Sequence, residues 1–126
     1  MQKVVKFGGS SLANSTQFEK VKNIVTSDIS RRIVVVSAPG KRFSGDTKVT
    51  DLLYICHAHI KYNAPFDDVF EKIAQRYKEI AESCGLKQDI DSELEGIKSK
   101  LNKKTSVDYI VSRGEYLNAR LMAEYL

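Results

Sequence analysis

Two short runs of apolar residues along the chain have the pattern of buried β-strands. The first covers residues 4–7 and stops at the Gly-Gly-Ser-Ser turn of residues 8–11. The second, residues 32–37, is continuous and rich in β-branched side chains, and it ends at the Pro-Gly pair of residues 39–40. Because a continuous apolar run leaves no polar side for solvent, we expect both strands to be buried on two faces of a parallel sheet covered by helices.

Between these two runs, apolar residues recur at helical spacing. Thr16 and Glu19 have the pattern of a capping box at the start of this helix. A strand, a helix and a strand in this order form a βαβ unit, which predicts that the two strands are parallel. The apolar stripe of the helix consists of Phe18, Val21, Val25 and Ile29.

After a polar loop at residues 40–48, helical spacing continues to the last residue. Pro65 occupies a plausible first-turn position of one of these helices, and Gly85 marks its end. Thr105 with Asp108 predicts a cap for the final helix. The four apolar stripes are Leu52, Leu53, Cys56 and Ile60; then Phe66, Val69, Phe70, Ile73, Tyr77, Ile80 and Cys84; then Ile90, Leu94, Ile97 and Leu101; and finally Val107, Ile110, Val111, Gly114, Leu117, Leu121, Met122 and Tyr125.

The predicted elements are out of balance for a complete domain. Two strands make a sheet that is marginal on its own, yet both strands read as buried and five helices would share them. The stripe of the final helix still holds at Leu126, with no stop signal. We therefore expect an α/β chain that is incomplete at its C-terminal end, with further strands or another molecule supplying the missing surface.

Composition agrees with a globular protein. Of the 126 residues, 42% are hydrophobic and 29% are charged, so disorder is not expected. No apolar run approaches the roughly 20 residues that cross a bilayer, and the first residues lack the features of a signal peptide. These observations predict a cytoplasmic protein without a membrane partner.

The remaining charged and metal-binding residue types give no strong functional signal. The net charge is +4, and the lysines at positions 98, 100, 103 and 104 lack interleaved aromatics, so we interpret them as a solvated helix face and expect no nucleic-acid partner. Cys56 and Cys84 fit no metal-ligand spacing and lie on apolar stripes, which predicts reduced core thiols. His57 and His59 lack a third ligand, so no metal site is predicted.

The turn at residues 8–11 carries the clearest chemistry. Glycines at the carboxyl end of a buried strand let peptide N–H groups approach a ligand and form a concavity for an anion. Ser10 and Ser11 add hydroxyl groups, and Lys6 adds an ammonium group. Holding and partly neutralising a phosphoryl group requires such an arrangement. The segment matches neither GxxxxGK[ST] nor GxGxxG, and a turn without a ligand is the alternative.

The six residues Lys-Phe-Gly-Gly-Ser-Ser at positions 6–11 resemble the signature of the aspartate kinases, whose kinase domain belongs to the amino-acid kinase family. Glutamate 5-kinase, acetylglutamate kinase and uridylate kinase share only a lysine-glycine core at this point. The resemblance implies that Lys6 assists phosphoryl transfer and that Lys6, Gly8, Gly9 and Ser10 line the site for the ATP phosphates.

The second strand and its loop resemble another signature of the family, a strand that ends in Ser-Ala. The resemblance implies that Ser37 borders the amino-acid site and that a threonine opening the next helix hydrogen-bonds the substrate. We align that threonine with Thr50, and Thr47 is the competing choice. A helix N-terminus suits an acidic substrate, because its free N–H groups favour anions. Thr50 as a helix N-cap is the alternative interpretation.

Residues 112–117 resemble the third signature, Ser-x-Gly-Glu, in which the glutamate recognises the substrate's α-amino group. This implies a substrate-binding role for Glu115. Gly114 falls on the apolar stripe, where glycine costs about 1 kcal/mol relative to alanine, so a close approach of backbone or ligand is expected there. An ion pair of Glu115 with Arg113, or simple exposure to water, is the alternative.

Together these resemblances imply a partial three-layer αβα amino-acid-kinase fold, with residues 1–126 as the N-terminal part of the catalytic domain and the regulatory ACT domains absent. They imply transfer of the γ-phosphoryl group of ATP to the β-carboxylate of L-aspartate, the first step towards lysine, threonine and methionine. Mg²⁺ is implied as well, with contacts outside these residues. We expect a homo-oligomer for the full-length protein and no activity for residues 1–126 alone. The rival hypotheses are a family member with another acidic substrate and a non-catalytic anion-binding module.

Overall fold

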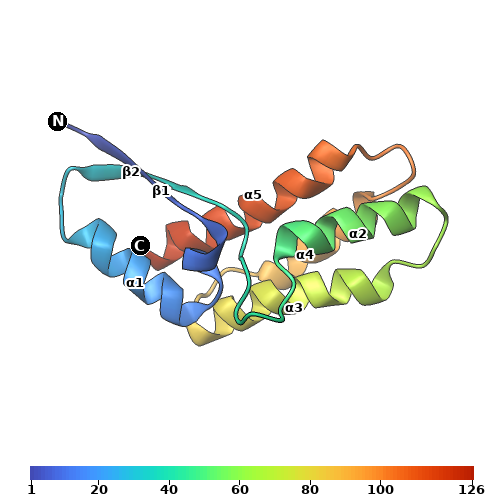
Figure 1. The fold of residues 1–126 in the computed structure, drawn as a ribbon, viewed down its shortest axis with the longest axis horizontal. Coiled ribbons are helices and arrows are strands. Elements are labelled where there is room, and N and C mark those ends of the chain that lie inside the picture. The colour runs from blue at the N-terminus through green and yellow to red at the C-terminus, as the bar shows by residue number, and fades with distance from the viewer.

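The computed structural model describes all 126 residues, and it contains two strands and five α-helices (Figure 1). The strands and α1 lie at one end of the molecule, α2 and α4 lie towards the other, and α3 and α5 run between the two ends, with α3 reaching α1 (Figure 1). A short 3-10 turn at Gly9–Leu12 follows the first strand. In chain order the elements are β1 (Lys3–Phe7), α1 (Ser15–Thr26), β2 (Arg31–Val36), α2 (Val49–Lys61), α3 (Asp67–Ser83), α4 (Ile90–Lys100) and α5 (Val107–Tyr125).

The strands β1 and β2 form a parallel two-stranded sheet, as the βαβ pattern predicted. Phe7 pairs with Val36 at the carboxyl end of the sheet, and Lys6 pairs with Val35. Paired residues of a sheet point to the same face, and neighbours along a strand alternate between faces. Val36 belongs to the hydrophobic core and Phe7 packs against it, so these two residues mark the face of the sheet that is turned towards the helices.

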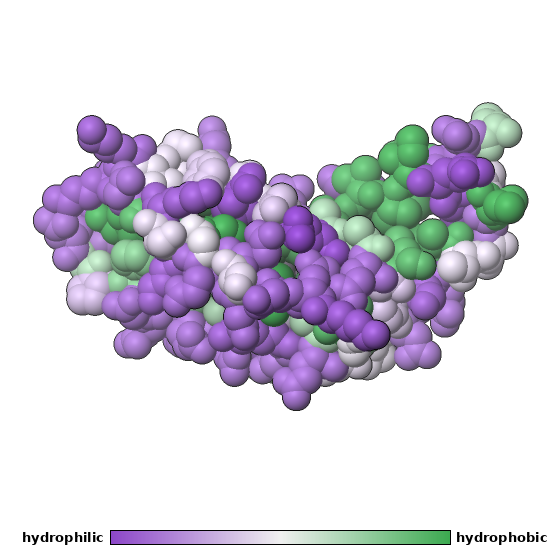
Figure 2. Space-filling model, turned by 180° about the vertical axis from the view of Figure 1, so that it is seen from behind, coloured by the Kyte–Doolittle hydropathy of each residue, from purple (hydrophilic) through white to green (hydrophobic).

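The prediction that both faces of the sheet are buried is wrong for this chain. Val4, Ile33 and Val35 are 64%, 47% and 41% exposed, because no helix of the chain covers the face on which they lie. Figure 2 shows the resulting hydrophobic area at the end of the molecule that carries the strands. The continuous apolar pattern is real, but only one of the two faces is covered within these residues.

The core lies mainly among the helices. Twenty-four buried residues form one hydrophobic cluster, and α3 contributes several of them, including the fully buried Tyr77. α2 packs against α3 and α5, and α4 packs against α3. The five predicted helices are therefore confirmed, because each apolar stripe finds its partners in this cluster. No helix has the length and apolar character needed to cross a membrane.

The predicted start of α1 is wrong. Asn14, not Thr16, caps the helix, and its side-chain oxygen accepts a hydrogen bond of 3.1 Å from the backbone N–H of Gln17. The helix also ends at Thr26, before the last residue of the predicted stripe. Ile29 is consequently 90% exposed in the turn that leads to β2.

The ends of the later helices differ in the same way. Ser106 rather than Thr105 caps α5, because its hydroxyl accepts from the backbone N–H of Tyr109. Pro65 precedes α3 by two residues instead of standing in its first turn. Gly85 does end α3 as predicted, with φ of +67°, a backbone conformation that favours glycine.

Candidate functional site

The glycine-rich turn after β1 touches the segment after β2 backbone to backbone. The N–H of Gly40 donates a hydrogen bond of 2.7 Å to the carbonyl of Gly9. A Cβ atom on Gly40 would lie 2.4 Å from the carbonyl carbon of Gly9, and one on Gly9 would lie 3.1 Å from the carbonyl oxygen of Ala38. A side chain does not fit at position 40 and would be crowded at position 9, so this contact explains why glycine suits both positions.

Gly8 differs from these two glycines. It is exposed, and nothing lies within 4 Å of the position that a Cβ atom would take. Its φ of −78° and ψ of 171° are open to any residue. Neither packing nor backbone conformation therefore requires glycine here, and the space above Gly8 is free for an approaching ligand.

Lys6 lies on the exposed face of the sheet, two residues before this turn. It pairs with Val35 across the sheet and forms no ion pair within the chain. Lys3, on the same strand, differs because its ammonium group lies 2.8 Å from the carboxylate of Asp28. The Lys6 ammonium group is therefore the unpaired charge of β1 next to the glycine turn.

The segment after β2 is fixed from α5. Ser37 continues the sheet, because its N–H donates to the carbonyl of Phe7 at 3.2 Å. Its own carbonyl accepts a hydrogen bond of 2.7 Å from the side-chain amide of Asn118, which is fully buried. A buried amide that pairs with a backbone carbonyl holds that carbonyl in one orientation. Ser37 is thereby placed between β1 and α5.

The loop at residues 40–48 is held by charged side chains. Asp46 forms an ion pair of 2.7 Å with Arg42 in the same loop and lies 3.5 Å from Arg76 of α3. The hydrogen bonds from Arg42 lower the pKa of Asp46 well below its usual range. Arg76 is only 3% exposed, and burial lowers the pKa of its guanidinium group. The loop is therefore held by a network of charged side chains that includes the buried Arg76 of α3.

The structure corrects the alternative role that the sequence allowed for Thr50. Lys48 is the N-cap of α2, and Thr50 stands inside the first turn, half-buried. Asp51 is the acidic residue of that turn. The competing threonine, Thr47, is exposed and lies in the loop just before the helix. Both threonines thus lie at the N-terminal end of α2, Thr50 inside the helix and Thr47 before it.

The third predicted segment reaches the same place. A Cβ atom on Gly114 would lie 2.8 Å from Cδ1 of Leu53 and 3.0 Å from Cβ of Ala38. The hydroxyl of Tyr77 donates to the carbonyl of Gly114 at 2.8 Å. A close approach at this glycine is confirmed, although side chains and not backbone or ligand make it, and α5 packs there against Ala38, which follows the second strand.

Glu115 follows directly and is exposed. It forms no ion pair, so the predicted alternative of a pair with Arg113 is wrong, whereas the other alternative, exposure to water, agrees with the structure. The Arg113 guanidinium lies 4.8 Å and 4.7 Å from the ring centroids of Tyr109 and Tyr116. Burial raises the pKa of Tyr77, and the negative charge of Glu115 raises it further. The Glu115 carboxylate is therefore unpaired and close to the contact between α3 and α5.

These contacts bring the three predicted segments together. Gly9 touches Ala38 and Gly40, and Ala38 touches Gly114, although more than a hundred residues separate the first of these from the last. The meeting point is the carboxyl end of a parallel sheet, where open α/β folds usually bind their ligands. The segments that meet here also carry the unpaired ammonium group of Lys6, the exposed backbone of Gly8, the N-terminus of α2 and the unpaired carboxylate of Glu115. This set can hold a zwitterionic or phosphorylated small molecule.

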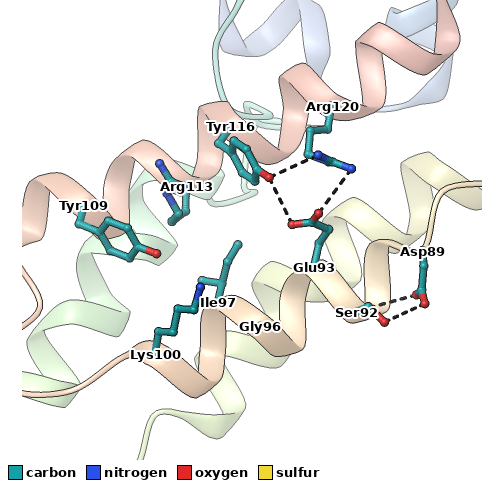
Figure 3. Close-up of a pocket in the computed structure, with 10 residues that line it drawn as sticks. All are labelled: Asp89, Ser92, Glu93, Gly96, Ile97, Lys100, Tyr109, Arg113, Tyr116 and Arg120. Carbon is teal, nitrogen blue, oxygen red and sulfur yellow. Dashed lines mark hydrogen bonds and ion pairs between the residues drawn. The ribbon is translucent and has the colours of Figure 1, made fainter.

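A separate cleft of about 430 Å³ lies between α4 and α5 (Figure 3). Within it, Glu93 lies 3.4 Å from both the Arg120 guanidinium and the Tyr116 hydroxyl (Figure 3). None of the predicted site residues lines it. The candidate site is therefore the meeting point of the strands and not this cleft.

Sequence reasoning missed the residues that support the site from inside. Arg76, Tyr77 and Asn118 each donate to a backbone carbonyl of a site segment. The predicted helices around Arg76 carried no motif, so nothing pointed to that segment. The available signal was a charged residue beside Tyr77, between Ile73 and Ile80 on an otherwise apolar stripe.

The family to which the chain belongs follows from a match to a family model. The chain belongs to the amino acid kinase family, whose family model matches residues 1–126. This confirms the family resemblance seen in the sequence. The α/β fold with a short parallel sheet and several helices, also predicted, is confirmed by the structural match described next.

The individual relatives are aspartate kinases. The chain is 45% identical to Aspartokinase 3 of Bacillus subtilis (strain 168) over 98% of its length, and it spans 28% of that protein. It is similar to the crystal structure of Clostridium acetobutylicum aspartate kinase, with a TM-score of 0.93 and 54% identity over 98% of this chain and 28% of the other. It also resembles E. coli aspartokinase III in complex with aspartate and ADP, with a TM-score of 0.79 and 27% identity over 99% of this chain and 28% of that chain. The chain thus spans little more than a quarter of the relatives that it matches.

Proposed function

We propose that residues 1–126 are the N-terminal part of the catalytic domain of an aspartate kinase, which transfers the γ-phosphoryl group of ATP to the β-carboxylate of L-aspartate. The observation that carries this proposal is the convergence of the three signature segments at the carboxyl end of the sheet, through Gly9, Ala38, Gly40 and Gly114. The similarity to several aspartate kinases, one of them in complex with aspartate and ADP, supports it.

In this proposal the turn after β1 holds the nucleotide. The backbone of Gly8 and Gly9 and the hydroxyl of Ser10 bind the ATP phosphates, and the open space at Gly8 leaves room for them. The ammonium group of Lys6 stabilises the negative charge of the phosphoryl group in transfer, for which its lack of an internal partner leaves it free. A positive charge that interacts more strongly with the transition state than with bound ATP lowers the activation barrier of phosphoryl transfer, in addition to any effect on ATP binding.

The amino-acid substrate lies between the second strand and α5. The unpaired Glu115 carboxylate binds the α-ammonium group of aspartate, and Thr50 and Ser37 orient the substrate from the other side. An oxygen of the β-carboxylate then attacks the γ-phosphorus in line, a bond from carboxylate oxygen to phosphorus forms, and the bond from phosphorus to the β–γ bridging oxygen breaks, which releases ADP. No base is required, because the carboxylate, with a pKa of about 3.9, is already ionised near neutral pH.

Mg²⁺ accompanies ATP in phosphoryl transfer and neutralises its phosphates. No group of three or more His, Cys, Asp or Glu side chains that could hold an ion is found in the chain, and in this proposal the protein contacts of Mg²⁺ lie outside residues 1–126. No step is therefore assigned to a metal bound by this chain. In this proposal the full-length protein is a cytoplasmic homo-oligomer that takes part in lysine biosynthesis.

A substrate panel tests this function. The complete polypeptide that contains these residues is incubated with ATP and either aspartate, glutamate or N-acetylglutamate, and ADP formation is followed together with trapping of the acyl phosphate by hydroxylamine. We expect aspartate to give both products and the other two to give little. A preference for glutamate or N-acetylglutamate would assign the chain to another branch of the family, and no turnover with any of them would indicate a non-catalytic module.

A further inference from the structure

Two consecutive residues of α3 reach the two sides of the candidate site from inside the core. Arg76 is 3% exposed and Tyr77 is fully buried. Neither belongs to a segment that carries a signature motif. Each uses its polar atoms on backbone carbonyls far along the chain, and these carbonyls belong to different site segments.

Arg76 ties together the two ends of the loop at residues 40–48. One guanidinium nitrogen donates to the carbonyl of Thr47 at 2.9 Å, and another donates to the carbonyl of Gly40. The loop residue Asp46 lies 3.5 Å away. Because the guanidinium group is planar and its donors have a fixed geometry, it sets the separation of the two carbonyls as well as their orientation. The loop therefore has a fixed base, with Gly40 against Gly9 and Thr47 just before α2.

Tyr77 ties α3 to α5. Its hydroxyl donates to the carbonyl of Gly114 at 2.8 Å and would lie 3.4 Å from a Cβ atom at that position. Glu115 is the next residue. A rigid ring with one buried hydroxyl therefore fixes how far the helix that carries Glu115 stands from α3.

We propose that Arg76 and Tyr77 act as positioning residues for the acidic substrate, by holding the loop at residues 40–48 and the Glu115 segment at a fixed separation. We call this pair the α3 brace. The proposal rests on the proposed function, because it assigns the substrate to the space between these two segments. Arg76 and Tyr77 do not touch the substrate; they act through the backbone of Gly40, Thr47 and Gly114. The geometry favours this role because adjacent residues on one helix, pointing to different segments, hold both segments to a single rigid element.

The buried charge gives independent support. A guanidinium group removed from water loses hydration, and the one carboxylate with which it forms an ion pair, Asp46, is shared with Arg42. One of its nitrogens, Nε, has no hydrogen-bond partner. An apolar side chain would fill the same volume without these costs, so the two carbonyl contacts are what the charge provides. Loss of these contacts is the perturbation to test.

The test uses two conservative variants and a matched control in the complete polypeptide. Arg76→Lys keeps the positive charge but loses the planar fork, and Tyr77→Phe keeps the ring but loses the hydroxyl. Lys72→Met is the control, because Lys72 is an exposed cation of α3 near the same loop and makes no ion pair. Tyr77→Phe should fold, since Gly114 lies within α5 and its carbonyl faces the usual helical partner four residues on.

Two measurements distinguish the positioning role of the α3 brace from the proposed aspartate kinase activity. Amide hydrogen exchange reports whether the segments are held, and steady-state kinetics report whether holding them matters. We expect Arg76→Lys to speed exchange in residues 40–49 and to raise KM for aspartate about tenfold, the factor that corresponds to a lost charge-assisted contact of about 1.4 kcal/mol. We expect Tyr77→Phe to raise KM for aspartate severalfold while KM for ATP stays within about twofold, as for a hydrogen bond of about 1 kcal/mol.

The outcomes are distinct. A lower melting temperature with unchanged exchange at residues 40–49, or with an unchanged KM for aspartate, would overturn the proposal and make the pair purely structural. Equal effects of Lys72→Met would overturn it too, because a substitution on the surface of α3 that touches neither carbonyl contact would then have the same consequence. If the wild-type protein does not phosphorylate aspartate, the proposed function fails, and hydrogen exchange still decides whether the α3 brace holds the two segments.

Discussion

Replacing Gly114 with alanine adds one methyl group at the point where α5 meets the second strand. That methyl would lie 2.8 Å from Cδ1 of Leu53, 3.0 Å from Cβ of Ala38 and 3.4 Å from the hydroxyl of Tyr77. The first two distances are shorter than packed carbon atoms allow, since carbon atoms pack at about 3.5–4.0 Å. Leu53 and Ala38 are each 5% exposed, so neither can turn away into solvent.

Two opposing terms set the size of the effect. Alanine is favoured over glycine in a helix interior by about 1 kcal/mol. An extra carbon in a filled core costs about 1–3 kcal/mol, and the Cβ of Ala38, which cannot rotate, puts this site in the middle of that range or above. The expected net result is a loss of about 1 kcal/mol in the free energy of unfolding, as the difference of these terms. The shift of α5 should also displace Glu115 and raise KM for aspartate.

Urea unfolding followed by circular dichroism measures this free energy, and Gly96→Ala is the matched control. Gly96 also lies inside a helix, α4, but nothing is found within 4 Å of its Cβ position. We therefore expect Gly96→Ala to stabilise the protein by about 0.5–1 kcal/mol, the propensity term alone. An equal gain for Gly114→Ala would show that α5 does not press on the strand end, and the convergence of the site segments would lose its main support.

Three further predictions concern the same structure. Gly40→Ala should destabilise the protein by about 3 kcal/mol or more in urea unfolding, because its Cβ would meet the carbonyl carbon of Gly9 at 2.4 Å and backbone atoms cannot yield. The pKa of Asp46 is lowered in the folded state, so its carboxylate stabilises the protein above the unfolded pKa of about 3.9, and this stabilisation is lost as the pH falls below that value. Asp46→Asn should therefore make the melting temperature depend less on pH in the acidic range, which a pH series of melting temperatures measures. Cys56, whose pKa burial raises to about 11, should react with a thiol reagent at pH 8 only at the rate of unfolding, as a denaturant titration of the labelling rate checks.

The sequence predicted the elements that have long apolar patterns and missed the details of their ends. β1, β2 and five helices follow from continuous or periodic runs, which have few alternative interpretations. The helix caps were wrong because residues of the same chemistry stand one or two positions apart. Asn14 replaces Thr16, and Ser106 replaces Thr105, and only the path of the chain decides between such neighbours.

The segments of the candidate site could be singled out from the sequence where their chemistry lies close together along the chain. The glycines at positions 8 and 9 follow a strand, and Gly114 interrupts an apolar stripe, so each can be recognised from its neighbours in the sequence. Arg76 and Asn118 did not, because their carbonyl partners lie 36 and 81 residues away. The apolar pattern of the sheet likewise showed that two faces are suited to burial, but it does not show what covers the second face.

The proposed role of Lys6 is the centre of this account, and a paired substitution on β1 tests it most directly. Lys6→Met removes the unpaired ammonium group beside the glycine turn, whereas Lys3→Met removes one that is already bound to Asp28 at 2.8 Å. Both variants should melt near the wild-type temperature, because exposed charges contribute little to stability. With ATP and aspartate, we expect Lys6→Met to lower kcat about 10²–10³-fold, as the loss of one charge-stabilising donor does, and Lys3→Met to leave it unchanged. Wild-type turnover by Lys6→Met would contradict the account.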